Sequence, residues 1–313
     1  MSVSIIIVNY NTGKILKDCV ESLFLYENPA NFEIVIIDNR SDDDSGEIIS
    51  GLSDKHKNIK FILNKEKVSF SEANNTGIDA STGDYVLIMN PDIIFTEPVF
   101  EKLSEDLENI NGLGAVIPML LGQDGNFQNR YFQKYPGLLQ YIFFYSVIAK
   151  LFHNSKTLTR KYLHIYSDDF NKEIEYVEQI PCAFFFTKRN IIREAGMMDK
   201  RYELFFEDVD LSYQISKKYK LAVNTKLNVT HLGGASFKTS DDYWLYGRFI
   251  ISMIVFFKKN YSELKTDALK FIARLNSGIV IISDKLIPGN GDKDKYRSRK
   301  HQYFLDQLKN SKI

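Results

Sequence analysis

VSIIIVNYN, residues Val3–Asn11, is an apolar, β-branched run that leads directly into polar residues. Three more runs rich in Ile, Val and Phe follow it, at Glu33–Asp38, Ile59–Leu63 and Tyr85–Met89. Between the runs lie longer segments whose apolar residues recur at helical spacing, such as Lys14–Tyr26 and Ser71–Ala80. Strands that alternate with crossover helices predict an α/β fold built on a mostly parallel sheet.

The middle of the chain keeps some of this pattern. Gly114–Pro118 and Pro181–Thr187 are strand-like, whereas Gly122–Tyr135 is polar, aromatic and glycine-containing, which is typical of a surface excursion. Phe205–Lys218 carries acids at its front and lysines at its back, and this suits the two ends of a helix dipole. The α/β pattern therefore extends well past the first four strands.

The last part of the chain has a different composition. From about Asp241 the sequence is predicted to be helical, with a break at Pro288–Gly291 and a basic tail over Lys293–Lys312. The tail is either solvated or a basic amphipathic helix that binds anionic lipid. We expect an α/β domain over residues 1–240 and a helical C-terminal extension over residues 241–313.

The net charge of the chain argues against nucleic acid as a partner. The 313 residues carry 40 Lys and Arg and 40 Asp and Glu, so the net charge is zero and no global field favours nucleic acid. Acids dominate the first part of the chain and bases the last, which indicates two different partners. No nucleic-acid function is expected.

Cysteine and hydropathy patterns indicate the compartment. Cys19 and Cys182 are the only cysteines, and they lack the spacing of a disulfide framework or a structural zinc site. No basic leader precedes Val3, so we expect a strand there and not a signal peptide. Leu138–Phe152 and Phe249–Phe257 fall short of the roughly 20 residues that cross a bilayer. We predict a cytoplasmic protein; Leu138–Phe152 is either a core helix or an interfacial segment.

Polar residues follow the predicted strands where they end. In open parallel sheets ligands bind outside the carboxyl ends of the strands. Asp38, at the end of the second strand, suits a pyrimidine N–H or a ribose hydroxyl, with Tyr10 packing on the base; alternatively Asp38 caps the next turn. Asp92 follows the stiff Pro91 and suits a divalent cation as a hard oxygen ligand, although Pro-Asp is also an ordinary turn.

Two later segments complete the candidate site. Glu207 and Asp208 open a predicted helix, where backbone N–H groups and the dipole keep a carboxylate ionised, as a base requires; they are equally acceptable as helix caps. His231 stands beside the glycine pair Gly233–Gly234, which lets the backbone approach a diphosphate, and its imidazole would complete a site with Asp92. A lone histidine is otherwise a structural residue.

Taken in order, these motifs resemble glycosyltransferase family 2, most closely its bacterial rhamnosyltransferase-like branch. The resemblance spans about Val3 to Phe237 and rests on the following segments: VSIIIVNYN ending at Asn11, VIIDN ending at Asn39, the helix at Asn74–Gly77, GDYVLIMNPD ending at Asp92, AGMMD ending at Asp199, FFEDVDL ending at Leu211 and HLGGAS ending at Ser236.

The resemblance implies the GT-A fold and a single displacement that inverts the anomeric centre. It implies Asp208 as the catalytic base and Asp92 and His231 as ligands of Mg²⁺ or Mn²⁺. With the strand-end argument, it assigns donor binding to Val8, Tyr10, Asn11, Asp38, Asn74, Asn90 and Asp92.

The partners implied are a nucleotide-sugar donor, either dTDP-rhamnose or a UDP-sugar, and a glycan or lipid-linked saccharide acceptor. Cell-surface polysaccharide synthesis at the inner face of the cell membrane is the expected setting.

This chain departs from the family pattern at two positions. Asn90 replaces the first acid of the Asp-x-Asp motif, which weakens the expected metal site, and Ser69 replaces a glycine before the Asn74 helix. The Gln-x-x-Arg-Trp element of processive synthases is missing, so one sugar per encounter is expected.

A non-catalytic nucleotide-sugar sensor or assembly subunit is the main alternative. A Rossmann oxidoreductase lacks support, because no Gly-x-Gly-x-x-Gly follows the first strand.

Overall fold

The computed structural model describes residues 2–152, 154–233, 243–286 and 292–310. The chain divides into two compact units. Unit 1 comprises Met1–Lys134, Ile165–Lys200 and Glu207–Lys238, and unit 2 comprises Tyr135–His164, Arg201–Phe206 and Thr239–Ile313. Each unit is therefore assembled from segments that are separated in the sequence. The division at residue 240 into two domains stays a prediction.

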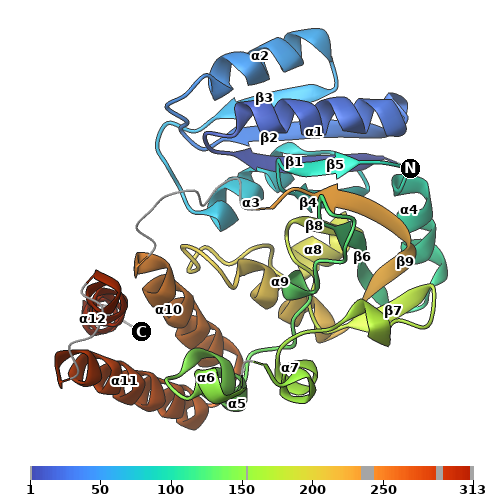
Figure 1. Ribbon diagram of the computed structural model, residues 1–313. Helices are drawn as coiled ribbons and strands as arrows, with labels where there is room; N and C mark the ends of the chain where they lie inside the picture. The colour runs from blue at the N-terminus through green and yellow to red at the C-terminus, as the bar shows by residue number, and fades with distance from the viewer. Residues whose placement is uncertain (1, 153, 234–242, 287–291, 311–313) are drawn as a thin grey trace. The chain divides into compact units, whose positions relative to one another are not determined.

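Unit 1 is an α/β unit (Figure 1). Its strands are β1 (Val3–Asn9), β2 (Phe32–Asp38), β3 (Ile59–Leu63), β4 (Tyr85–Met89), β5 (Ile93–Phe95), β6 (Leu113–Leu121), β7 (Ile174–Val177), β8 (Phe184–Lys188) and β9 (Lys220–His231). Its helices are α1 (Gly13–Tyr26), α2 (Ser45–Lys55), α3 (Phe70–Ala80), α4 (Phe100–Asn109), α8 (Arg189–Glu194) and α9 (Glu207–Ser216). Short 3₁₀ turns stand at Pro29–Asn31, Asn129–Tyr131 and Ser167–Asp169.

The strands form one sheet in the order β3-β2-β1-β4-β8-β6-β9-β5, and β7 pairs with β9. The first four strands along the sheet are parallel, as predicted. β1 and β4 are buried at every position, because helices cover both faces of a parallel sheet. The predicted α/β fold is confirmed, and antiparallel β8, β5 and β7 give the second half of the sheet its mixed character.

The sheet curls back on itself. Only Asn90–Asp92 separates β4 from β5, yet β5 pairs with β9, which lies three strands beyond β4 in the sheet. Because three residues span at most about 10 Å, the β9 edge must return to the carboxyl end of β4. The β5–β9 pairing sets Ile93 opposite His231 and so brings the loop after β4 to the end of β9.

Helix α3 shows how closely the helices approach the sheet. It packs against β1 and β2, and a Cβ on Gly77 would lie 2.4 Å from Ile6 Cγ2 and 2.7 Å from Ile37 Cδ1. Ser69 is the N-cap of α3, and its hydroxyl accepts a hydrogen bond from Glu72 N at 3.2 Å. The serine that departs from the family pattern therefore has a local structural role.

Unit 2 is helical. It contains α5 (Leu138–Gln140), a π-helical turn η3 (Tyr141–Tyr145), α6 (Ala149–Phe152), α7 (Lys156–Tyr162), α10 (Tyr243–Asn260), α11 (Glu263–Leu286) and α12 (Asp292–Asn310). The last three pack against one another, as the predicted helical extension requires.

Some expectations for unit 2 need correction or lie outside the structure. Leu138–Phe152 is not one helix but three short pieces, and Ser146, which joins η3 to α6, takes an extended backbone. The predicted break at Pro288–Gly291 lies outside the described residues. None of the helices in the described ranges is long and apolar enough to cross a membrane.

Candidate active site

The carboxyl ends of β1 and β2 are joined by a hydrogen-bond network around Asp38. Asp38 is buried, and its Oδ1 accepts from Asn9 Nδ2 at 2.9 Å and from the Ser41 hydroxyl. Asp38 Oδ2 accepts from Ser41 N at 3.1 Å. The carboxylate therefore holds the β2 turn to β1, as the capping interpretation anticipated. Nucleobase binding by Asp38 stays a prediction.

The predicted donor residues on the β1 loop differ in exposure. Val8 is a buried strand residue, whereas Tyr10 is 37% exposed and Lys67 Nζ lies 3.5 Å from the centre of its ring. Asn11 has a φ of 54°, and its side-chain amide pairs with Asp42 through two hydrogen bonds. Tyr10 and Lys67 thus present an aromatic face and a cation to solvent at this edge.

Two further predicted donor residues, Asn74 and Asn90, form hydrogen bonds to backbone atoms. Asn74 is buried in α3, where its Nδ2 donates to Phe70 O at 2.9 Å and its Oδ1 has no hydrogen-bond partner. Asn90 is half-buried, and its backbone N donates to Ala183 O at 3.1 Å. This contact places the start of β8 beside the loop after β4.

Asp92 and His231 lie together, as predicted. His231 Nε2 is 3.3 Å from Asp92 Oδ1, and both side chains are buried. Asp92 Oδ2 accepts a hydrogen bond from Gly233 N at 3.1 Å, and Leu232 N donates to Asp92 O at 3.0 Å. Their proximity follows from the β5–β9 pairing, which no local motif of the sequence predicts.

Gln128 fixes the orientation of the His231 ring. Its Nε2 donates to His231 O at 2.9 Å, so its Oε1 faces His231 Nδ1 at 2.7 Å. Because this oxygen only accepts, Nδ1 must carry the proton, and in the neutral ring Nε2 keeps a lone pair directed at Asp92. The Tyr131 ring packs edge-on against the imidazole. The polar sequence of this loop predicts only a surface excursion, and no motif marks Gln128 or Tyr131 as part of the site.

The Asp92–His231 pair fits a cation. Asp92 Oδ1 is buried without a hydrogen-bond partner and lies 3.3 Å from His231 Nε2, so a neutral imidazole would offer a second lone pair to an ion bound beside this oxygen. A carboxylate oxygen and an imidazole nitrogen are both ligands of first-row divalent ions. No group of three or more His, Cys, Asp or Glu suited to a metal occurs within the described part of the chain. This protein would thus supply two ligands, with Asn90 in place of the missing acid.

Helix α9 begins with two acidic residues, Glu207 and Asp208, which belong to unit 1 as Asp92 and His231 do. Burial raises the pKa of Asp208, and burial together with the neighbouring Asp208 charge raises the pKa of Glu207. Glu207 Oε2 has no hydrogen-bond partner. Both carboxyls lie in the first turn of the helix, where the charge of Asp208 makes it harder to ionise Glu207.

The segment before β8 fixes α9 to the sheet. Ile180 N donates to the Ser212 hydroxyl at 3.0 Å, and the backbone of Cys182 stabilises the Asp208 carboxylate. Ala183 in turn contacts Asn90. The first turn of α9 therefore lies at the carboxyl end of β4, the edge that also holds Asp92 and His231. Gly234–Ser236 of the glycine motif lie outside the described residues.

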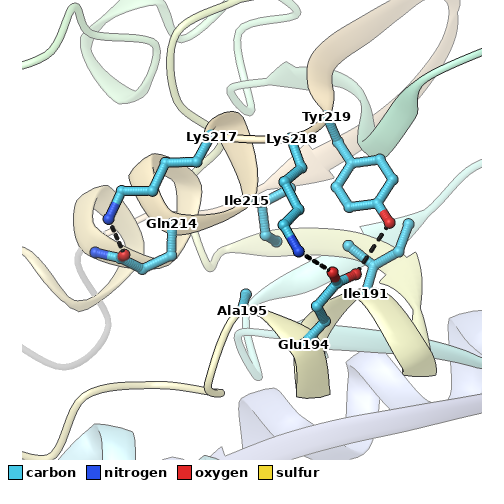
Figure 2. Close-up of a pocket in the computed structure, with 8 residues that line it drawn as sticks. All are labelled: Ile191, Glu194, Ala195, Gln214, Ile215, Lys217, Lys218 and Tyr219. Carbon is cyan, nitrogen blue, oxygen red and sulfur yellow. Dashed lines mark hydrogen bonds and ion pairs between the residues drawn. The ribbon is translucent and has the colours of Figure 1, made fainter.

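A small pocket of about 150 Å³ lies elsewhere in unit 1 (Figure 2). It is lined by α8, α9 and Tyr219, directly before β9, and therefore lies at the amino end of that strand. Its polar groups bond to one another: Glu194 pairs with Lys218 and accepts from Tyr219 Oη, while Lys217 donates to Gln214. No predicted site residue lines this pocket.

Comparison with known proteins identifies the family. A model described as Glycosyl transferase family 2 matches residues 4–194. Glycosyltransferase GlyG of Streptococcus pneumoniae is 31% identical over 130 residues, 42% of this chain and 42% of that protein. A dolichyl N-acetyl-alpha-D-glucosaminyl phosphate 3-beta-D-2,3-diacetamido-2,3-dideoxy-beta-D-glucuronosyltransferase of Methanococcus voltae is 31% identical over 125 residues, 37% of this chain and 39% of that protein. The chain spans less than half the length of either relative.

A solved structure extends the likeness to the whole chain. The mannosyltransferase PcManGT from Pyrobaculum calidifontis, in complex with GDP-Man and Mn²⁺, has a TM-score of 0.57 and 10% identity, over 98% of this chain and 85% of that one. At this identity the likeness concerns the fold, and the predicted GT-A fold is confirmed. Because the family model covers more than half of the sequence, the chain belongs to glycosyl transferase family 2.

Proposed function

We propose that the protein transfers one sugar from a nucleotide-sugar to an acceptor hydroxyl, with inversion at the anomeric carbon. The observation that carries this proposal is the orphaned Asp92 Oδ1, which faces His231 Nε2 at 3.3 Å at the carboxyl edge of the sheet. A buried carboxylate oxygen without a partner is costly unless a ligand satisfies it.

The Asp92–His231 pair would hold a divalent cation. When bound, that cation would offset the negative charge that develops on the departing nucleoside diphosphate. Gln128 would keep His231 in the tautomer that binds metal, and the Gly233 backbone N–H holds the second oxygen of Asp92 in place. The Mn²⁺ in PcManGT supports a cation of this kind.

Asp208 would act as the base. The acceptor oxygen forms a bond to the anomeric carbon, its proton passes to Asp208, and the bond from that carbon to the phosphate oxygen breaks, releasing the nucleoside diphosphate. Because burial raises the pKa of Asp208, the group would gain proton affinity as the reaction needs it to. The raised pKa also implies that activity falls on acidification at a higher pH than for an exposed aspartate.

The proposal also concerns the identity of the donor and of the acceptor. The donor would be dTDP-rhamnose or a UDP-sugar, and it would be bound by Val8, Tyr10, Asn11, Asp38, Asn74, Asn90 and Asp92. The Methanococcus voltae relative acts, by its name, on a dolichyl-phosphate-linked sugar, which supports a lipid-linked acceptor. Both cysteines are buried free thiols, which suits the cytoplasmic face of the cell membrane and surface-polysaccharide synthesis.

The Asp208→Asn variant tests the base. We expect transfer to fall about 10²–10⁴-fold, while the Kd of the nucleoside diphosphate stays unchanged. Asp210→Asn is the matched control on the same helix, where the asparagine oxygen still accepts from Gln214, and it should keep its activity. Thermal melting checks that both variants fold. Normal turnover of Asp208→Asn would exclude this residue as the base.

A further inference from the structure

Helix α11 exposes its large apolar side chains. Leu264, Phe271, Leu275, Ile279, Ile282 and Leu286 recur at steps of three, four and seven residues, which places them along one side of the helix. Their exposed fractions run from 45% for Ile279 to 81% for Leu264. We call this row the α11 stripe. A contiguous apolar surface of this kind marks an interaction site.

The opposite side of α11 is buried and mixes the apolar residues Leu269, Ala273 and Val280 with the polar residues Thr266, Asn276 and Ser277. Asn276 accepts from Val147 N at 2.7 Å and donates toward Tyr141 and Tyr246, while the Ser277 hydroxyl bonds to His301 at 3.0 Å. This inner face packs against α10 and α12 (Figure 1). The helix is therefore already packed within unit 2 through this buried side, and the α11 stripe lies on its other side.

Charge indicates what covers the stripe. Unit 2 contains 19 Lys and Arg against 9 Asp and Glu, and unit 1 contains 21 against 31, so the balanced net charge conceals a strongly basic unit. On α11 itself, helical geometry places the exposed Arg274 and Lys285 along one flank of the stripe, together with the acids Glu263 and Asp267, and the exposed Lys265 along the other. Asp267 pairs with Lys270. An exposed apolar row on a strongly basic unit matches an anionic membrane surface.

We propose that the α11 stripe docks on the surface of an anionic lipid bilayer, with its Leu, Phe and Ile side chains in the headgroup layer and its cations at the lipid phosphates. The helix would lie in the membrane plane, since it is not apolar enough to cross. A second copy of the chain fits the stripe less well, because a symmetric α11–α11 contact would bring two strongly basic units together. The proposal is independent of sugar transfer, as membrane docking needs neither donor nor acceptor.

Co-sedimentation of the full chain with sucrose-loaded vesicles tests the proposal. We expect binding to vesicles of phosphatidylcholine with phosphatidylglycerol, and at least about tenfold weaker partitioning to phosphatidylcholine alone or at high salt. The double variant Leu275→Glu/Ile282→Glu should lower partitioning to the mixed vesicles by at least about tenfold. The matched control is Leu25→Glu in α1 of unit 1, at a leucine that is 75% exposed, and it should bind as the wild type does.

A second pair of variants separates charge from apolar contact. Arg274→Gln/Lys285→Gln leaves the stripe intact and should weaken binding to the mixed vesicles by about tenfold or more, at about fivefold per cation. Leu275→Ser/Ile282→Ser removes apolar surface without adding charge and should still reduce binding. All of these side chains are exposed, and unchanged melting curves would confirm the fold.

Three results would overturn the proposal. The first is a wild-type chain that does not bind the mixed vesicles, and the second is equal binding by the stripe variants. The third is a wild-type dimer, seen by sedimentation velocity, that becomes monomeric in Leu275→Glu/Ile282→Glu, since it would show that a second copy covers the stripe.

Discussion

At the level of single residues, the His231 ring is held in place by hydrogen bonds from a neighbouring loop. Gln128 forms one hydrogen bond to the backbone oxygen of His231 and one to its Nδ1, so the position of the imidazole does not depend on Asp92 alone. Partners of this kind orient metal ligands in many proteins, and their loss weakens metal binding.

Replacement of Gln128 by Leu therefore has a defined consequence. We expect Mn²⁺ to bind about 10–100-fold more weakly in the presence of UDP or dTDP, measured by titration calorimetry, because the ring is no longer held in one tautomer. Gln123→Leu, in the same loop on an exposed side chain, is the control. Equal Mn²⁺ affinity in the two variants would show that Gln128 has no positioning role.

Glu207 couples stability to pH. Its pKa is raised by burial and by the Asp208 charge, so the folded chain holds this proton more tightly than the unfolded chain. The free energy of unfolding therefore falls as pH rises from the ordinary glutamate pKa through the raised folded pKa, since the folded state must then bury a charge.

Glu207→Gln removes the titrating group and should remove this penalty. Compared with the wild type, we expect the variant to gain melting temperature progressively from pH 5 to pH 8.5. Melting scans across this range, with the two proteins in the same buffers, measure the difference. A difference that stays constant with pH would contradict the raised pKa.

The motifs of the sequence pointed to one pair of neighbouring residues but not to the residues that support it. Asp92 and His231 were predicted to share a site, and they do lie together. Gln128, Tyr131 and Ser41 carry no motif, because their roles depend on loops whose paths are set by long-range contacts. The sequence left Asp38 open between a donor contact and a turn cap, and the structure shows its carboxylate bonded within the turn.

At the level of the secondary-structure elements, the parallel strands could be predicted from the sequence, because short runs rich in Ile and Val that alternate with helical segments are typical of buried parallel strands. The curl of the sheet could not be predicted from the sequence, because it depends on the pairing of the three-residue strand β5 with β9. A strand of that length has too little periodicity to be identified from the sequence. Leu138–Phe152 was misjudged for a related reason, since its continuous apolar pattern hides the extended backbone at Ser146.

Helix α3 offers a direct test of close helix–sheet packing. Gly77→Ala should destabilise the protein by about 1–3 kcal/mol, because the new methyl group would overlap Ile6 and Ile37. Gly51→Ala in α2 is the matched substitution at a glycine with no atom within 4 Å of the added Cβ, and it should stabilise by about 0.5–1 kcal/mol. Urea denaturation midpoints give both values. Changes of the same sign would show that α3 does not pack as described.

For the molecule as a whole, the net charge of zero is the sum of an acidic unit 1 and a basic unit 2. The acid-rich beginning and base-rich end of the sequence indicated this asymmetry, but the assignment of residues 135–164 to the basic unit required the structure. The sequence also suggested lipid contacts at Leu138–Phe152 and in the tail. The α11 stripe was missed, because exposed and buried sides of an amphipathic helix look alike until the packing is known.

We propose that the residues at the carboxyl edge of the sheet catalyse metal-assisted sugar transfer and do more than bind a nucleotide. Asp92→Asn removes a charged ligand from the proposed cation site. Asp84→Asn, at the other end of β4, is the matched control, because its carboxylate contacts Ser2 far from the carboxyl edge.

The most direct measurement is release of nucleoside diphosphate from a panel of UDP-, dTDP- and GDP-sugars, with saccharide acceptors and with either Mn²⁺ or EDTA. We predict that the wild type and Asp84→Asn release nucleoside diphosphate from at least one donor, and that this release is lost with EDTA and in Asp92→Asn. Donor binding without any release would instead identify a nucleotide-sugar sensor, and release that is unchanged by EDTA and by Asp92→Asn would contradict the proposed site.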